Sequence, residues 1–424
     1  MTAGDRVSLT IEKPVAGGRM LARHDGAVVL VSGAIPGEVV EAEIEKLQRG
    51  TAWARTIRVI DRASDRVDAA DAACGGNVLA HVRYERQLSL KRDIIRDAFT
   101  RIARLPLADD LSVTASPTEG YRMRARLHVV NGHIGFFREG THQWCDPGST
   151  GQLLPGTLAV VKSLEAVLGA RPDAGVVDVE VAENCPADQR ALHLLLRDDR
   201  DPSQFAAPAS IGDVAGVSCG RLRGGRPLVL WGLPEVTDTI VMPGGTSESA
   251  VSLTRQAHAF FQGNRYLLPA LVAAVTAVVP AGRVLDLYAG VGLFSVALAA
   301  RGDTDVIAVE GDRTAAHDLK FNASRAGGAI ETRHQTVEAF LATRRVPSLD
   351  TVVVDPPRTG LTKDALRGTI ALRAARIVYV SCDVATLGRD ARMLVDAGYR
   401  LGEVRAFDLF PNTAHIETMA LFER

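Results

Sequence analysis

From residue 253 onward the chain repeats one unit, in which a short apolar strand is followed by a polar turn and a helix. The strand ends are RVLDLYAG, DVIAVEGD, DTVVVDPP and ARIVYVSC. Strands that alternate with helices predict an α/β fold with a doubly wound, mostly parallel sheet. Such sheets bind ligands outside the carboxyl ends of their strands. We therefore expect the polar residues at the four strand ends to meet in one cleft.

Two regions rich in short strands precede this sheet. Residues 7–59 contain β-like runs broken by glycine, which predicts a small antiparallel barrel. Residues 84–104 have apolar side chains at helical spacing and contain no helix breaker, so we expect a long helix there. Residues 114–251 return to strands and turns, with Asn131-Gly132 as the turn of a hairpin.

These patterns predict three domains. We expect an OB-like β-barrel over residues 1–62, a β-rich central α+β domain over 63–252 and the α/β domain over 253–424. The helix at about 84–104 is expected to pack on the α/β domain.

Charge and cysteine content narrow the possible functions. Lys and Arg number 49 against 50 Asp and Glu, so a nucleic-acid partner would need a local basic patch. Five cysteines at long spacings, with no C-x-x-C, disfavour a disulfide framework and a zinc site, and we expect no metal ion. The first residues do not resemble a signal peptide and no apolar run is long enough to span a bilayer. We expect a cytoplasmic protein without a membrane partner.

The turn DLYAGVG follows the first strand of the α/β domain. Gly290 and Gly292 allow a tight turn and a close approach of the backbone to a ligand. A dinucleotide fold would place a third glycine where Ser295 stands. With Asp286 before the turn and Glu310 at the end of the next strand, the pattern favours S-adenosylmethionine over NAD, and Glu310 would accept hydrogen bonds from the ribose hydroxyls. A glycine turn without a ligand and an exposed carboxylate are the alternatives.

The turn DPPRTGL holds Asp355 in a segment stiffened by two prolines. Methyltransferases that act on exocyclic amines of bases tend to carry an aromatic residue after Pro-Pro, and Arg358 stands in that place. Amino methylation is therefore disfavoured. The alternative is that this turn only ends a strand.

Cys382 comes directly after the strand ARIVYVS. A cysteine in that place is more often a packing residue, but a helix beginning near Ala385 would lower its pKa. A thiolate beside a methyl donor indicates covalent catalysis, because addition to carbon 6 of a pyrimidine makes carbon 5 nucleophilic. Glu417, within the apolar run HIETMALFER, would then remove the carbon 5 proton with a raised pKa. Alternatively, Glu417 and Glu423 lie on a solvated face of the strand.

With these residues in place, the chain resembles the S-adenosylmethionine-dependent RNA (uracil-5-)-methyltransferases, which make 5-methyluridine in tRNA and 23S rRNA. FFQGN, DLYAGVG, VEGD, DPPRTGL, SC-x-x-x-TL-x-RD and HIETMALFER stand in that family's order and spacing. The N-terminal barrel, with GAIPGEVVEAEI, looks like the family's RNA-binding TRAM domain. The resemblance implies a Rossmann-like methyltransferase domain, S-adenosylmethionine as cofactor and an RNA partner.

The resemblance also implies roles for individual residues. Cys382 matches the nucleophile that adds to uracil carbon 6, and Glu417 matches the proton acceptor. The matches to family positions that line the donor and target-base cleft are Gln262, Tyr288, Glu310 and Asp355, beside Gly290 and Gly292 of the turn. Gln262 and Asp355 would lie nearest the uracil, which must leave its stack to enter.

Three arginines in GYRMRARLHV have the spacing of one strand face. Arg122, Arg124 and Arg126 would present their guanidinium groups to RNA phosphates. An ordinary solvated strand face is an equally good interpretation.

The chain departs from the family at two places. Many members bind a 4Fe–4S cluster through four cysteines, whereas this chain has Asp68, Cys74 and Asn77 at three of the positions and Cys145 only near the fourth, so we expect no cluster. Asp383 follows the nucleophile where the family has Asn, and its carboxylate would tend to raise the pKa of the thiol.

Three other functions are compatible with parts of the pattern. An RNA 5-methylcytidine methyltransferase usually has Pro-Cys where Asp355-Pro356 stands here. A non-catalytic RNA-binding or RNA-folding factor would need neither Cys382 nor Glu417. A dehydrogenase is disfavoured by Ser295. The sequence does not distinguish tRNA from rRNA, and we expect a monomer without an obligate protein partner.

Overall fold

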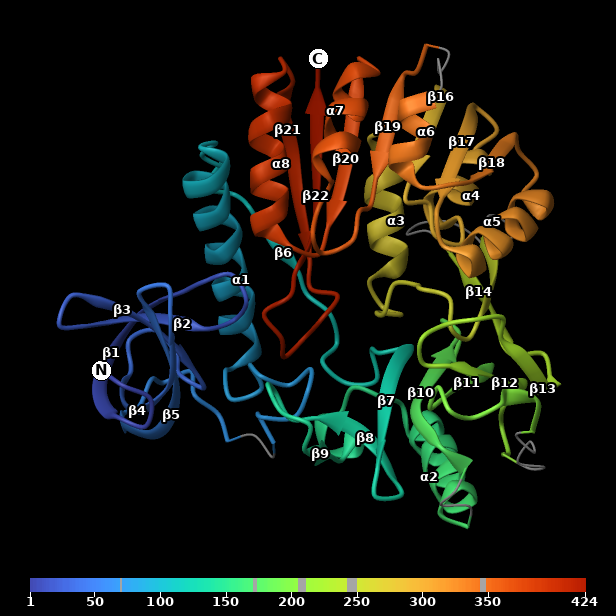
Figure 1. The fold of residues 1–424 in the computed structure, drawn as a ribbon. Helices are drawn as coiled ribbons and strands as arrows, with labels where there is room; N and C mark the ends of the chain where they lie inside the picture. The colour runs from blue at the N-terminus through green and yellow to red at the C-terminus, as the bar shows by residue number, and fades with distance from the viewer. Residues whose placement is uncertain (69–70, 171–173, 205–210, 242–249, 344–347) are drawn as a thin grey trace.

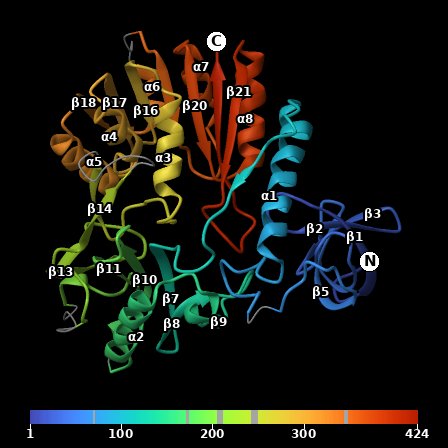
Figure 2. The same cartoon turned by 180° about the vertical axis from the view of Figure 1, so that it is seen from behind.

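The computed structural model describes residues 1–68, 71–170, 174–204, 211–241, 250–343 and 348–424. Figure 1 shows an N-terminal barrel to one side of a long helix, a central β-rich region below, and a large sheet with helices above. Figure 2 shows the same arrangement from behind. The fold class expected from the sequence is confirmed.

The N-terminal barrel is closed. Its strand order is β1-β2-β3-β5-β4, and β3 and β5 are the one parallel pair among its strands. Alternate residues of β4 are buried, which places one face of the strand inside the barrel. The strands are β1 (Arg6–Pro14), β2 (Met20–His24), β3 (Ala27–Ser32), β4 (Val39–Gln48) and β5 (Thr51–Asp61).

The central region is built on a sheet of order β13-β12-β11-β10-β7-β8-β9. The hairpin between β7 and β8 turns at Asn131 and Gly132, whose φ angles of 51° and 85° are those of a type I′ turn, as the sequence predicts. Helix α2 (Pro155–Gly169) packs on β8. The strands are β7 (Arg124–Val130), β8 (His133–Phe137), β9 (Trp144–Cys145), β10 (Val176–Glu183), β11 (Arg190–Leu196), β12 (Gly216–Arg221) and β13 (Leu228–Gly232), and 3₁₀ turns lie at Pro147–Thr150 and Pro202–Gln204.

A separate hairpin connects the central region to the α/β region. It consists of β14 (Glu235–Ile240) and β15 (Val251–Gln256), which pair with each other. The residue boundary expected at 252 thus falls inside β15. Asn322 and Asp318 of α5 (Arg313–Arg325) bind the backbone of β15, so this strand is held to the α/β region.

The C-terminal sheet has the order β18-β17-β16-β19-β20-β22-β21-β6. Strands β16 to β20 are parallel and β22 is antiparallel to β20. The strand order reverses between β16 and β19, which is where such a sheet opens a binding crevice. The strands are β16 (Gly282–Leu287), β17 (Thr304–Glu310), β18 (Ile330–His334), β19 (Thr351–Val354), β20 (Arg376–Ser381), β21 (Arg400–Phe407), β22 (Glu417–Glu423) and β6 (Val113–Thr114).

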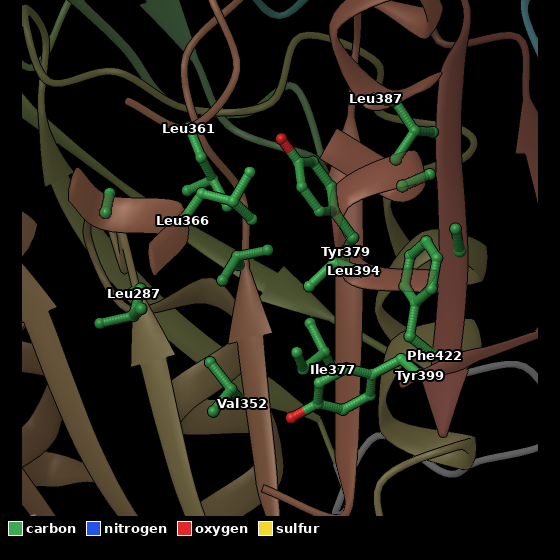
Figure 3. Packing of buried hydrophobic residues seen from close by; sticks show 14 of the residues in the cluster. Leu287, Val352, Leu361, Leu366, Ile377, Tyr379, Leu387, Leu394, Tyr399 and Phe422 are labelled. Atoms are coloured by element: carbon green, nitrogen blue, oxygen red, sulfur yellow. The ribbon is translucent and has the colours of Figure 1, made fainter. Parts of the chain in front are cut away.

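Apolar side chains fill both faces of this sheet. In β19, Val352 and Val354 point to one face and Val353 to the other, and all three are fully buried. Figure 3 shows the first face, where Ile377 and Phe422 pack among leucines of the covering helices. Helices α6 (Val337–Thr343), α7 (Lys363–Ala371) and α8 (Val384–Asp396) cover it, while α3 (Leu268–Ala277), α4 (Leu293–Ala299) and α5 cover the other.

The long helix expected near residues 84–104 contacts both the N-terminal barrel and the C-terminal sheet region. It consists of α1 (Tyr84–Ala98), continued by a π-helical turn (Phe99–Ala103), and it packs on α8 as expected. The loop of residues 408–416, between β21 and β22, descends from the sheet beside α1 in both views (Figures 1 and 2). Lys91 of α1 binds Asp408 and the carbonyl of Phe410 in this loop, so the helix anchors it.

None of the helices in the described part of the chain is long and apolar enough to cross a membrane.

Candidate active site

A cavity of about 720 Å³ opens at the carboxyl ends of the parallel strands. Its floor comes from the ends of β16, β17, β19 and β20, as the sequence predicts, and the start of β7, the segment after β15 and residues of the 408–416 loop complete it. The lining side chains considered below are Arg122, Arg124, His258, Phe260, Gln262, Tyr288, Gly290, Glu310, Asp355, Arg358, Cys382, Phe410 and Glu417.

The turn after β16 exposes its backbone to the cavity. Tyr288 and Gly290 have φ angles of 63° and 57°, and an added Cβ at Gly290 would meet no atom within 4 Å. Gly292 differs, because an added Cβ would lie 2.9 Å from Leu319 Cδ1. Gly290 thus leaves room for a ligand, whereas Gly292 lets α4 approach α5.

Glu310 is fixed by the same turn. Its Oε2 accepts a hydrogen bond from the Gly290 N–H at 2.8 Å, and its Oε1 accepts one from the Asp312 N–H at 2.6 Å. Each carboxylate oxygen has a second lone pair that remains free for a donor. The arrangement suits a ligand that carries neighbouring hydroxyl groups.

Gln262 and Asp355 are in contact deeper in the cavity. Gln262 Nε2 donates to Asp355 Oδ2 at 3.2 Å. Removal from water raises the pKa of Asp355 to about 7, and the nearby charge of Asp286 adds to the effect. Asp286 is itself buried, with its pKa raised to about 7, and accepts a hydrogen bond from Ser295 Oγ at 2.5 Å. A planar ligand with a donor and an acceptor edge would fit against this amide and carboxyl pair.

Cys382 lies between the end of β20 and the start of α8. Burial raises the pKa of its thiol to about 12, Glu417 adds to the rise and Arg358 opposes it. The net shift of this pKa is therefore opposite to the lowering expected from the helix. Asp383 explains part of the difference, because its Oδ1 accepts hydrogen bonds from the Ala385 and Thr386 N–H groups at 3.0 and 2.8 Å, and these groups are then not free for the sulfur.

Glu417 is the first residue of β22 and is 1% exposed. Its Oε1 has no hydrogen-bond partner within the described residues. Burial and the neighbouring Asp355 raise the pKa of this carboxyl well above its usual value. The raised pKa agrees with the prediction for a base, and the alternative of a solvated face is wrong for Glu417.

Arg124 and Arg126 lie on one face of β7 and are paired, whereas Arg122 lies two residues before the strand. Arg124 binds Glu180 at 3.2 Å, and Arg126 binds Asp178 at 2.5 Å across the sheet. Arg122 has no carboxylate partner among the described residues, and its Nη1 donates to Gln152 at 2.6 Å. Of the three, Arg122 is thus the one best able to bind an anion at the cavity.

Several lining residues were not predicted from the sequence, among them His258, Phe260 and Phe410. Phe260 is the first residue of the FFQGN motif and His258 lies two positions before it, and this closeness was the one available signal for these two residues. Phe410 lies on the 408–416 loop and carries no local signal.

Cys74 and Cys145 form one disulfide, although the long cysteine spacings disfavoured a disulfide framework. The spacing of the two cysteines along the chain did not predict this contact. The backbone of Cys74 forms an isolated β-bridge with Arg138, just after β8, and Cys145 in β9 pairs with Phe136 of β8, so β8 brings the two cysteines together. No group of three potential metal ligands gathers in the part of the chain described.

The fold and cavity define a class I methyltransferase-like sheet joined to a closed five-stranded barrel. The TRAM domain family matches residues 2–57, and the tRNA (Uracil-5-)-methyltransferase family matches residues 345–424. The 23S rRNA (uracil(1939)-C(5))-methyltransferase RlmD of Halomonas elongata is 31% identical, covering 99% of this chain and 89% of that protein. The RlmD of Alkalilimnicola ehrlichii is 33% identical, covering 96% and 94%.

A solved structure has the same architecture. The tRNA (uracil-54, C5)-methyltransferase of Pyrococcus abyssi, in complex with S-adenosyl-L-homocysteine, matches with a TM-score of 0.77 at 23% identity and covers 98% of this chain and 99% of that chain. This likeness supports the fold. The two RlmD proteins and the matching family model show that the chain belongs to the RNA (uracil-5-)-methyltransferase family. It is an RNA methyltransferase that acts on uracil carbon 5.

Proposed function

We propose that this enzyme transfers the methyl group of S-adenosylmethionine to carbon 5 of a uridine in 23S rRNA, with Cys382 as nucleophile and Glu417 as base. The observation that carries the mechanism is the meeting of Cys382, Glu417 and the Gln262–Asp355 pair in one cavity beside the Gly290 turn.

The methyl donor fits the side of the cavity formed by β16 and β17. Glu310, held by backbone N–H groups, would accept the ribose hydroxyls, and the open backbone at Gly290 would let the donor approach closely. Tyr288, in the same turn, also lines the cavity. The donor supplies an electrophilic methyl group on a sulfonium.

The residues of this chain account for the remaining chemistry. The Cys382 thiolate adds to uracil carbon 6, and the electron pair of the C5–C6 bond moves toward the carbonyl at carbon 4. Carbon 5 then takes the methyl group. The Glu417 carboxylate then removes the carbon 5 proton, the C5–C6 double bond forms again and the thiolate leaves carbon 6. Gln262 and Asp355 would orient the ring edge while this occurs.

Two features support a folded RNA as substrate. The N-terminal barrel matches the TRAM domain family, and Arg122 of the central region lines the cavity with a guanidinium that has no carboxylate partner among the described residues. The 23S rRNA is favoured because two relatives named for that substrate align over nearly their whole length. A tRNA is the second candidate, since the matching family model and the solved structure are named for tRNA.

RNA that carries 5-fluorouridine at the target tests the mechanism. Fluorine cannot leave carbon 5 as a proton does, so the elimination that follows methyl transfer should stall with the RNA still bonded to Cys382. We expect a covalent complex, stable in denaturant, with the wild type and none with Cys382→Ala. On ordinary RNA, Glu417→Gln should accumulate the same complex while the control Glu403→Gln, on an exposed ion pair of β21, should turn over normally. A stable complex formed by Cys382→Ala would overturn the proposal.

A further inference from the structure

Arg358 has no part in the mechanism above, although it follows the Asp355-Pro356-Pro357 turn. Building on the proposed function, we propose that Arg358 is a further catalytic residue, whose guanidinium holds the Cys382 sulfur as a thiolate for attack on the uracil.

Hydrogen bonds to α8, the helix that follows Cys382, hold the turn that carries Arg358. Thr386 Oγ1, in the first turn of α8, donates to the Arg358 carbonyl at 3.3 Å. Arg389, one turn further along α8, donates to the Thr359 carbonyl at 3.3 Å. The Arg358 turn is thus joined at two points to α8, the helix that begins two residues after Cys382.

The guanidinium of Arg358 is available for the sulfur. It lines the cavity with Cys382 and Glu417, and its positive charge acts to lower the pKa of the thiol. No carboxylate forms an ion pair with it among the residues that the structure describes, in contrast to Arg124 and Arg389, which are paired. Its charge is therefore not neutralised before substrate binds.

The other groups around the thiol oppose its ionisation. Glu417 from β22 and Asp355 from β19 both add negative charge, and burial adds to their effect. Asp383 occupies the first N–H groups of α8, which removes the usual helix contribution. Arg358 is the cation that lowers the pKa of Cys382, so the nucleophile depends on it.

The step balances without a further reactant. The S–H bond of Cys382 breaks, the proton passes to solvent and the electron pair stays on sulfur beside Arg358. When this pair forms the S–C6 bond, the electron pair of the C5–C6 double bond moves and negative charge develops on the exocyclic oxygen at carbon 4. The guanidinium then has an anion within the same cavity to stabilise.

Alkylation of Cys382 by iodoacetamide measures thiolate formation without RNA or methyl transfer. Iodoacetamide is neutral, so Arg358 does not attract it. The rate at Cys382, followed by mass spectrometry of its peptide between pH 7 and 9, should be lower in Arg358→Gln. Each unit of pKa rise leaves tenfold fewer thiolates, and the greater nucleophilicity of a more basic thiolate recovers about threefold, so we expect a rate about threefold lower per unit.

Two matched variants complete the test. Arg358→Lys keeps the charge and should alkylate within about twofold of wild type, while Arg392→Gln, an exposed residue of α8 paired with Asp396, should not change the rate. A wild-type rate in Arg358→Gln, or equal losses in the Gln and Lys variants, would overturn the inference. Because wild-type synthesis of 5-methyluridine is assayed separately, failure of the inference is distinguishable from failure of the proposed function.

Discussion

The buried ion pair between Lys91 and Asp408 anchors the loop that leads into Glu417, and Lys91→Met should be strongly destabilising. Both side chains are 0% exposed, and Lys91 also donates to the Phe410 carbonyl at 3.0 Å. Methionine has a similar volume, so the loss is electrostatic. It would leave Asp408 buried with Tyr84 OH at 3.0 Å as its remaining side-chain donor. Breaking such a pair costs about 3–5 kcal/mol.

Urea unfolding followed by circular dichroism at 222 nm is the suitable assay, because the three tryptophans, Trp53, Trp144 and Trp231, lie outside the C-terminal sheet. The control Lys13→Met breaks a pair with Asp97 in which Lys13 is 44% exposed, and it should cost less than about 1 kcal/mol.

A neutral partner should rescue the variant. Adding Asp408→Asn to Lys91→Met removes the unpaired charge while keeping an acceptor for Tyr84, so the double variant should regain much of the lost stability. If Lys91→Met costs no more than Lys13→Met, the pair does not anchor the loop and the reasoning fails.

Three further predictions concern the cavity and the disulfide. The single-turnover rate of proton removal should fall as the pH decreases through the raised pKa of Glu417, where an exposed glutamate would still be ionised; a flat profile between pH 5 and 8 would contradict this. Gly290→Ala forces alanine to a φ of 57°, so it should cost about 1 kcal/mol and raise KM for S-adenosylmethionine in a methyl-transfer assay, and an unchanged KM would place the donor elsewhere. Reduction of Cys74–Cys145, 71 residues apart, should lower the free energy of unfolding by about 4 kcal/mol by chain entropy, and dithiothreitol without effect on denaturant unfolding would contradict it.

The parts of the site that follow from periodicity were predictable from the sequence. Parallel strands bring their carboxyl ends to one edge, so Glu310, Asp355 and Cys382 could be expected in one cleft. The burial of Glu417 followed from the apolar run around it. Each of these inferences depends on one repeated local pattern.

The parts that depend on partners distant in the chain were not predictable. The helix was expected to acidify Cys382, but Asp383 takes its N–H groups and Glu417, which lies 35 positions further along the chain, opposes ionisation. Arg124 had the spacing of a phosphate-binding face, and its carboxylate partner lies on β10. Phe410 lines the cavity because Lys91 binds its loop, and neither the sequence around Lys91 nor the sequence around Phe410 predicts this contact.

Transfer of labelled methyl from S-adenosylmethionine tests the central claim most directly. The acceptors are 23S rRNA and tRNA, each prepared without 5-methyluridine, and the enzymes are wild type and Cys382→Ala. We expect label in 5-methyluridine of 23S rRNA with wild type and none with Cys382→Ala. Label in cytidine, or continued labelling of uridine by Cys382→Ala, would contradict the account.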